Sequence, residues 1–131
     1  MQNIRVGVIG VGYWGKKIAN EYLQLSKQNS FVDLYAVCDL LEDNLKYYEN
    51  NGVTRVTRNY KETISSSNVD AVNVCTPNET HYKICTEALE AGKHVLVEKP
   101  MTLSSAEAYE LVDLAHRQNL VLSVGHIFRF N

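Results

Sequence analysis

The sequence predicts an α/β fold, in which a doubly wound parallel sheet carries helices on both faces. Two observations lead to this prediction. Short apolar segments alternate with longer amphipathic segments along the 131 residues, which is the order expected of a parallel sheet with crossover helices. The apolar segments are rich in Val and Ile and nearly free of charge, as strands buried on both faces are.

The first three elements are a strand at residues 4–9, a helix at 13–27 and a strand at 32–38. Both strand segments are short apolar runs, which is typical of strands inside a parallel sheet. The helix is predicted from large side chains that recur at helical spacing, namely Trp14, Ile18, Tyr22 and Leu25.

The middle of the chain predicts a helix at 42–50, a weak strand at 53–56 and a short helix at 60–65. Asn51 and Gly52 follow the first of these helices. Glycine readily takes the left-handed conformation that ends a helix, so the helix is expected to stop there.

The last part of the chain repeats the alternation of strand and helix. Gly92 ends one helix, and the pattern from Ser104 to Glu107 is a capping box that begins another. The elements of this part are expected at residues 71–74, 79–90, 94–97, 104–118 and 120–124.

Composition indicates one globular domain in the cytoplasm. Apolar residues make up 45% and charged residues 21%, and the net charge is −2. A charge this close to neutral gives no basic surface for nucleic acid or for a membrane. No signal peptide and no apolar run of roughly 20 residues is present, so neither secretion nor a membrane span is expected.

The three cysteines are Cys38, Cys75 and Cys85, with no CxxC spacing among them. An odd number at these spacings predicts free, mostly buried thiols in a reducing compartment. Neither a metal site nor a disulfide framework is expected.

A glycine-rich loop follows the first strand and precedes the first helix, with the pattern G-x-G-x-x-G formed by Gly10, Gly12 and Gly15. Gly10 permits a tight turn, Gly12 lets the backbone approach a pyrophosphate, and Gly15 lets the helix pack closely on the strand. The helix N-terminus offers unpaired N–H groups to phosphates. In this context the loop predicts a dinucleotide site.

An acid stands where such a site needs one. Asp39 ends the second strand, where a carboxylate can accept both hydroxyls of an adenosine ribose. Leu40 and Leu41 follow, with no Arg or Ser to hold a 2′-phosphate, which favours NAD over NADP. The alternative is a structural role, in which Asp39 caps the helix beginning near Glu42.

Unusual polar residues follow most of the predicted strands. Ligands of open parallel sheets bind outside the carboxyl ends of the strands, so these residues should meet at one edge. Each also has a plainer interpretation as a turn, a helix cap or a solvated ion pair. The residues are Asp39, Thr76, Pro77, Asn78, Glu98, Lys99 and His126.

Lys99 is the candidate catalytic residue. It lies between Glu98 and Pro100, and the proline favours an extended backbone that fixes where the lysine projects. A lysine beside an oxidised, positively charged nicotinamide in a closed site would favour its neutral form, which suits it to take a proton from a substrate hydroxyl. The alternative is a surface lysine paired with Glu98.

The histidines differ in what their positions predict. His81, early in a helix after Thr76 and Pro77, either contacts the cofactor or packs structurally. His94 and His116 are expected to be structural. His126 ends the last strand at the active edge and is a candidate contact.

Three segments of the chain resemble the glucose-fructose oxidoreductase and inositol dehydrogenase (Gfo/Idh/MocA) family. They are VGVIGVGYWG at residues 6–15, CTPNETH at 75–81 and AGKHVLVEKPM at 91–101. The resemblance implies a Rossmann domain followed by an α/β domain with an open antiparallel sheet. That second domain would carry most substrate contacts and the interface of a homo-oligomer.

The resemblance also implies roles for individual residues. Lys99 would be the catalytic lysine, and His126 and Arg129 would join it as substrate contacts. The NAD-binding residues would be Gly10, Gly12, Tyr13, Trp14, Gly15, Asp39, Thr76, Pro77, Asn78, His81 and Glu98.

The predicted boundaries are a dinucleotide-binding domain at 1–125 and the start of a connection to a further substrate domain at 126–131. The final segment is similar to that of family members acting on nucleotide-linked sugars, such as UDP-N-acetylglucosamine-type 3-dehydrogenases.

The expected function is hydride transfer between NAD and a secondary alcohol of a sugar, nucleotide sugar or cyclitol, a reaction of sugar metabolism. We expect this chain alone to bind NAD with little or no turnover. The competing hypothesis is a non-catalytic dinucleotide sensor with the same fold.

Overall fold

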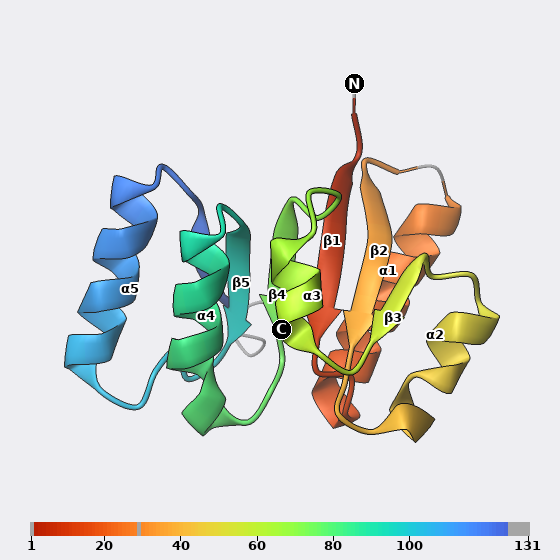
Figure 1. Ribbon diagram of the computed structural model, residues 1–131, viewed down its shortest axis with the longest axis horizontal. Coiled ribbons are helices and arrows are strands. Elements are labelled where there is room, and N and C mark those ends of the chain that lie inside the picture. The colour runs from red at the N-terminus through yellow and green to blue at the C-terminus, as the bar shows by residue number, and fades with distance from the viewer. Residues whose placement is uncertain (1, 29, 126–131) are drawn as a thin grey trace.

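The computed structural model describes residues 2–28 and 30–125, and these residues form six strands in one sheet (Figure 1). The strand order is β3-β2-β1-β4-β5-β6, and every neighbouring pair is parallel. This order defines the doubly wound dinucleotide-binding fold, whose direction of winding changes between β1 and β4. The strands are β1 (Ile4–Ile9), β2 (Val32–Cys38), β3 (Arg55–Thr57), β4 (Ala71–Val74), β5 (His94–Glu98) and β6 (Leu122–Gly125).

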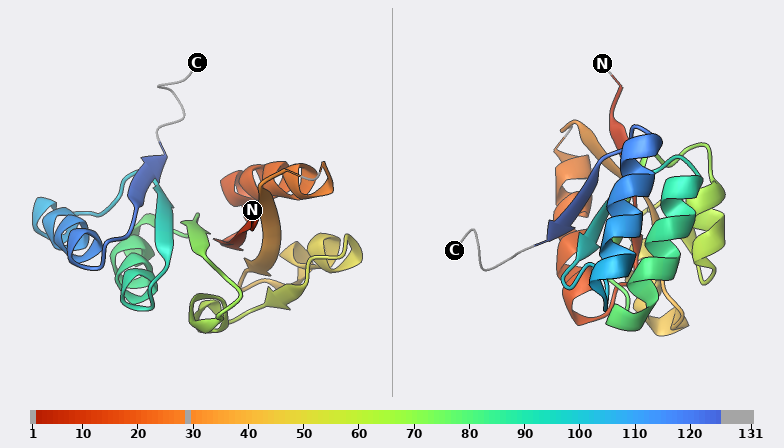
Figure 2. Two further views of the ribbon diagram at one scale, coloured as in Figure 1. Left: turned by 90° about the horizontal axis from the view of Figure 1, so that it is seen from above. Right: turned by 90° about the vertical axis from the view of Figure 1, so that its left-hand side faces the viewer.

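Helices cover both faces of the sheet, which confirms the predicted fold class. Seen from above, α1 lies on one face, and α3, α4 and α5 lie on the other (Figure 2). The helices are α1 (Tyr13–Lys27), α2 (Lys46–Asn50), α3 (Tyr60–Ser65), α4 (His81–Glu90) and α5 (Ser105–Arg117), with single 3₁₀ turns η1 (Glu42–Asn44) and η2 (Asn78–Thr80).

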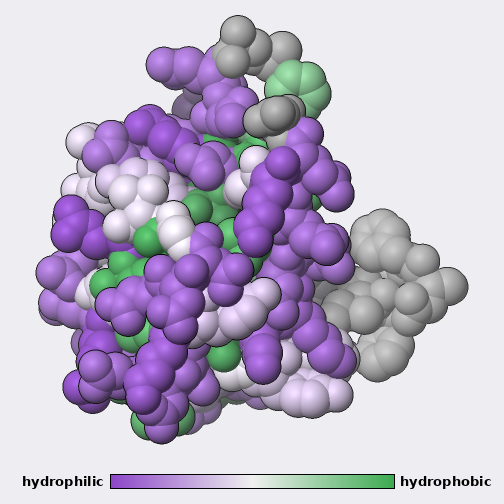
Figure 3. Space-filling model, turned by 90° about the vertical axis from the view of Figure 1, so that its right-hand side faces the viewer, coloured by the Kyte–Doolittle hydropathy of each residue, from purple (hydrophilic) through white to green (hydrophobic). Residues whose placement is uncertain are grey.

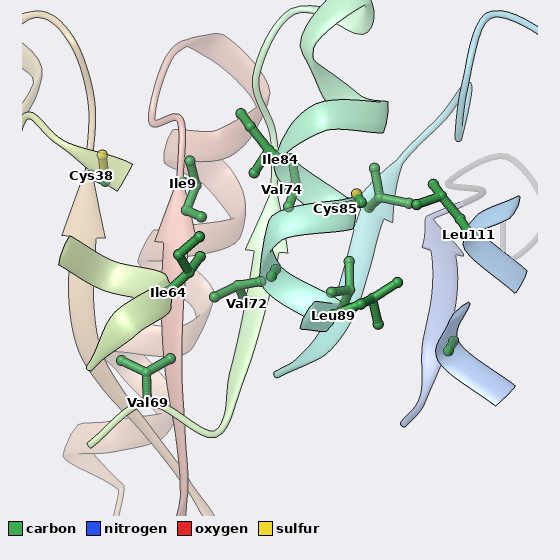
Figure 4. Close-up of a cluster of buried hydrophobic side chains, with 14 of the residues drawn as sticks. Ile9, Cys38, Ile64, Val69, Val72, Val74, Ile84, Cys85, Leu89 and Leu111 are labelled. Atoms are coloured by element: carbon green, nitrogen blue, oxygen red, sulfur yellow. The ribbon is translucent and has the colours of Figure 1, made fainter. Parts of the chain in front are cut away.

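Two hydrophobic clusters form the core, one on each side of the sheet. The larger packs strand residues such as Val72 and Val74 against α3, α4 and α5 (Figure 4). The smaller packs Val8 and Val37 against α1 and Tyr48 of α2. The central strands β1 and β4 are buried on both faces of the sheet, so their sequences are mostly apolar and rich in Val instead of alternating between apolar and polar residues.

Several elements differ in detail from the sequence prediction. The helix expected at 42–50 is divided into η1 and α2, and the helix expected at 79–90 is divided into η2 and α4. β3 and β6 each begin two residues later than expected. In α1 the residues that face the sheet are Gly15, Ala19 and Leu23, whereas Trp14 is 48% exposed and Leu25 is 37% exposed. The inward stripe of α1 is therefore made of small residues and one leucine, because the helix packs close to the strands.

The outer surface is mostly hydrophilic on the side formed by α1, α2 and β3 (Figure 3). Among the described residues, no helix is long and apolar enough to cross a membrane.

Candidate functional site

The glycine-rich loop between β1 and α1 takes a conformation that its first glycine makes possible. Gly10 has a φ of 93°, and a Cβ there would lie 2.8 Å from the carbonyl oxygen of Cys75. A Cβ on Gly15 would lie 1.8 Å from the carbonyl oxygen of Gly10. The predicted reasons for these two glycines, a tight turn and close helix packing, are both confirmed.

The N-terminus of α1 is open and carries no acidic residue in its first turn. A Cβ on Gly12 would meet no atom within 4 Å, so the backbone there is accessible to a ligand. The helix begins without a side-chain cap, so its first N–H groups point out of the helix without intrahelical partners. A hollow of about 480 Å³ borders this turn and is lined by Gly12, Tyr13, Lys16 and Lys17, among others. The helix dipole and two ammonium groups favour an anion at this place.

Asp39 ties the glycine loop to the turn that follows β2. Its Oδ2 accepts a hydrogen bond from the Val11 N–H at 2.8 Å, and its Oδ1 accepts from the Leu41 N–H at 2.8 Å and from Asn44 Nδ2 at 3.1 Å. The bonds to Leu41 and Asn44 hold the turn before η1, but η1 has no side-chain cap, so the helix cap expected as the alternative role of Asp39 is not formed. Two carboxylate oxygens offer about four acceptor positions, so the carboxylate retains capacity for a ribose hydroxyl.

A pocket of about 280 Å³ lies at the carboxyl ends of the strands. It brings together residues from the glycine loop, from the end of β4 and from the end of β5, as the sequence predicted. Its lining residues are Trp14, Cys75, Thr76, Asn78, His81, Glu98 and Lys99. Pro77 lies between two of them and is exposed.

The Glu98 carboxylate lies at the inner side of this pocket. A Cβ on Gly125, the residue paired with Glu98 in β6, would lie 2.8 Å from Glu98 Oε1. The carboxylate therefore occupies the space that a side chain at position 125 would fill. Burial, with a smaller contribution from Glu98, raises the pKa of the Cys75 thiol to about 12, so Cys75 is a neutral thiol near pH 7.

Lys99 lines the same pocket, yet its side chain is largely exposed. The closed site expected around the lysine is therefore not formed by the described residues. His126 and Arg129 lie outside the described residues.

His81 is buried beneath the pocket, with only 1% of its surface exposed. Its Nδ1 lies 2.7 Å from the Pro100 carbonyl oxygen, and its Nε2 lies 2.9 Å from the Thr76 carbonyl oxygen. It thus contacts the backbone on both sides of the pocket, although the sequence left open whether it packs or binds.

Two groups near the site were not found from the sequence. Arg58, which follows β3, donates from Nε to the Leu40 carbonyl oxygen at 2.9 Å, so a guanidinium does lie beside the residue after Asp39. Asn73, 1% exposed, accepts from the Tyr22 hydroxyl at 2.9 Å and donates to the Leu96 carbonyl oxygen at 3.3 Å. An asparagine within a Val-rich strand was the available signal for the second group. No sequence signal pointed to Arg58, because only the order of strands in the sheet brings β3 beside β2.

The remaining cysteines and His94 have structural positions. Cys38 and Cys85 are buried free thiols, as expected, and burial raises the pKa of each to about 12. His94 accepts from the Val121 N–H through Nδ1 at 3.0 Å and so joins the entries to β5 and β6. In the described parts of the chain, no group of three or more His, Cys, Asp or Glu residues could hold a metal ion.

Solved structures of other proteins have a domain with the same fold as this chain. The fold matches scyllo-inositol dehydrogenase from Lactobacillus casei, solved with bound cofactor NAD(H) and scyllo-inositol, with a TM-score of 0.88 and 26% identity over 99% of this chain and 38% of that one. It also matches UDP-N-acetylglucosamine 3-dehydrogenase from Acidithiobacillus ferrooxidans, with a TM-score of 0.84 and 34% identity over 98% of this chain and 40% of that one.

Sequence comparison gives relatives of the same two kinds, a UDP-N-acetylglucosamine 3-dehydrogenase and an inositol dehydrogenase. The chain is 35% identical over 129 residues to the UDP-N-acetylglucosamine 3-dehydrogenase of Acidithiobacillus ferrooxidans and 33% identical over 129 residues to the myo-inositol 2-dehydrogenase of Thermotoga maritima. Each match spans 98% of this chain but only 39% and 37%, respectively, of the two relatives. The family model described as "Oxidoreductase family, NAD-binding Rossmann fold" matches residues 4–126. The chain therefore belongs to the Gfo/Idh/MocA oxidoreductase family and forms its NAD-binding Rossmann domain.

Proposed function

We propose that this chain is the cofactor-binding part of a dehydrogenase that moves a hydride between NAD and a secondary alcohol of a sugar, nucleotide sugar or cyclitol. The observation that carries the proposal is the pocket at the strand ends, where Glu98 and Lys99 lie beside Thr76 and Trp14. The relatives named above act on inositols and on a UDP-linked sugar, and they support the substrate class.

The residues present fit NAD at each part of the molecule. The pyrophosphate would lie at the N-terminus of α1, against Gly12 and Tyr13, where the backbone is accessible and no acid opposes it. The adenosine ribose would be held by Asp39. The nicotinamide would enter the pocket that Trp14 and Glu98 line, with Thr76, Pro77 and Asn78 along its edge.

Lys99 would move the proton while NAD, when bound, accepts or supplies the hydride. Oxidation of a secondary alcohol releases a hydride from carbon and a proton from oxygen, so a base must receive the proton. We assign this role to the Lys99 amine, because Lys99 is among the residues that line the pocket. A further domain would close the site over this exposed lysine, supply other substrate contacts and form the interface of a homo-oligomer.

Two measurements test the proposal. Calorimetric titration of this chain should show NAD binding that is tighter than NADP binding. In the whole protein, Lys99→Ala should lower turnover by about 10²–10⁴-fold while NAD affinity stays within a few-fold. Glu79→Ala, an exposed change on η2 near the pocket, is the matched control. Unchanged turnover in the Lys99 variant would favour the sensor hypothesis instead.

A further inference from the structure

The environment of His81 restricts the protonation state of its ring. Both ring nitrogens lie within hydrogen-bond distance of backbone carbonyl oxygens, that of Pro100 on one side and that of Thr76 on the other. A carbonyl oxygen only accepts, and a neutral imidazole carries one N–H. Both contacts are hydrogen bonds only when both ring nitrogens carry a proton, so this geometry fits the imidazolium ion. In the neutral ring, one nitrogen lone pair would face a carbonyl lone pair at under 3 Å.

His94 differs from His81, because one of its ring nitrogens accepts a hydrogen bond. The backbone N–H of Val121 donates to its Nδ1 at 3.0 Å, and a protonated nitrogen could not accept that bond. His94 is therefore neutral where this contact is made, and it is a direct comparison for His81.

We propose that His81 is a positioning residue which, as an imidazolium, fastens the turn after β5 to the loop after β4. Thr76 lines the pocket, and Pro100 directly follows Lys99. With both hydrogen bonds made, one rigid ring sets the distance between these two backbone segments and so holds the Lys99 backbone relative to Thr76. For the roles of Lys99 and NAD, the inference rests on the proposed function, whereas the charge of His81 does not depend on it.

The charges around His81 act in both directions. Burial and the positive end of the α4 dipole oppose the imidazolium. The two carbonyl oxygens favour it, and so does the Glu98 carboxylate, which lines the same pocket. Lys99 also lines the pocket and opposes it, while Cys75 is a neutral thiol.

Two other carboxylates around α4 are engaged away from His81. The Glu87 carboxylate accepts from the Tyr60 hydroxyl at 2.6 Å on the side of α3. The Glu110 carboxylate of α5 accepts from the Tyr82 hydroxyl. Glu98 is the carboxylate among the residues that line the pocket together with His81.

This arrangement makes cofactor binding depend on pH in a defined direction. Loss of one ring proton removes one of the two hydrogen bonds, so either Thr76 or Pro100 is released. The protonated form is the one that organises the pocket, and NAD affinity should therefore fall as pH rises through the titration of His81, by at most about tenfold per pH unit.

The first test measures the ring nitrogens directly, without any ligand. In the ¹⁵N spectrum of the histidine-labelled chain near pH 7, both His81 nitrogens should carry protons, while His94 should show an unprotonated Nδ1. A His81 ring with one unprotonated nitrogen from about pH 6 upward, in a folded chain, would overturn the inference.

The second test measures NAD affinity by calorimetry between about pH 6 and pH 8.5. In His81→Phe, which has a ring but no donors, affinity should be weak and should lose the pH dependence that His81 causes. His81→Gln keeps N–H donors that do not titrate, so its affinity should lie between the two and vary less with pH. The same pH dependence in wild type and in the Gln variant would overturn the role of His81 in positioning. A chain that binds no NAD at any pH would overturn the proposed function, and the nitrogen spectrum would still decide the charge of His81.

Discussion

At the scale of single residues, the glycines of one loop serve two different needs. Gly15 has no room for a side chain because the Gly10 carbonyl lies where its Cβ would be, whereas Gly12 faces open space. A glycine needed for packing and a glycine that leaves the backbone open to the proposed ligand are therefore only three positions apart. Their positions in the G-x-G-x-x-G pattern predicted this difference, although the residue type is the same.

This difference gives a pair of matched predictions. Gly15→Ala should lower the free energy of unfolding by about 3 kcal/mol, because the added methyl group cannot be accommodated without moving the loop. Gly12→Ala should change it by less than about 1 kcal/mol and should weaken NAD binding, because its methyl group would project to where the pyrophosphate is proposed to lie. Urea unfolding and calorimetry on both variants separate the two effects. Equal losses of stability would show that the loop has no open side.

Asp39 and Arg58 together predict how the chain chooses between cofactors. Asp39→Ser removes the carboxylate that would repel a 2′-phosphate, and Arg58 lies beside Leu40 to receive one. The ratio of NADP to NAD affinity should rise by about tenfold or more, with NAD itself bound about tenfold more weakly. Asp43→Ser removes the same charge from an exposed ion pair with Lys46 and should leave the ratio unchanged. A change common to both variants would attribute the preference to net charge.

At the scale of elements, short-range signals explain most of the helix and strand limits. Gly52 and Gly92 have φ values of 81° and 83°, and they end α2 and α4 as expected of left-handed caps. Ser104 accepts from the Glu107 N–H at 3.1 Å and begins α5 as the capping box predicted. The division of the segment at 42–50 into η1 and α2 was not predicted from the sequence.

The contribution of the α5 cap to stability can be tested by mutation. Ser104→Ala removes the oxygen that accepts from Glu107, and it should lower the free energy of unfolding by about 1 kcal/mol. Ser105→Ala, one residue inside the exposed start of the helix, is the comparison and should change it by less than about 0.5 kcal/mol. Urea denaturation of both variants measures the two changes in the free energy of unfolding. If the two losses were alike, the hydroxyl of Ser104 would have no special role.

At the scale of the whole molecule, the 91–101 segment contributes to both ends of the sheet. Lys93, buried at the start of β5, donates to the carbonyl oxygens of Ser66 and Val69 at 2.6 and 2.7 Å. Burial lowers its pKa, yet the two carbonyls hold its amine beneath the loop between α3 and β4. Glu98 and Lys99 lie at the other end, in the pocket. One run of sequence thus contains a structural lysine and a proposed catalytic one, separated by the length of a strand.

A long-range ion pair predicts how the fold responds to acid. Arg5 at the start of β1 donates to both carboxylate oxygens of Asp70, which precedes β4, and these bonds lower the pKa of Asp70. A carboxyl whose pKa is lowered by folding adds stability above its unfolded pKa of about 3.9, and this stability is lost as pH falls through the folded value.

Asp70→Asn should therefore destabilise the chain near pH 7 and reduce the loss of stability on acidification below about pH 4. Urea unfolding at several pH values measures both effects. Asp113→Asn, which breaks an exposed pair with Arg117 within α5, should have a smaller effect at neutral pH. An acid response unchanged in the Asp70 variant would contradict this account.

The sequence by itself determined the order of strands and helices, the glycine loop and Asp39, because these depend on local periodicity and on residues close together in the chain. The tertiary structure alone decided that Arg58 lies beside Leu40 and that His81 lies between Thr76 and Pro100. Those contacts follow from the parallel order of the sheet, which places the ends of distant strands at one edge. No local pattern records such distances, since they are set by the packing of the whole sheet.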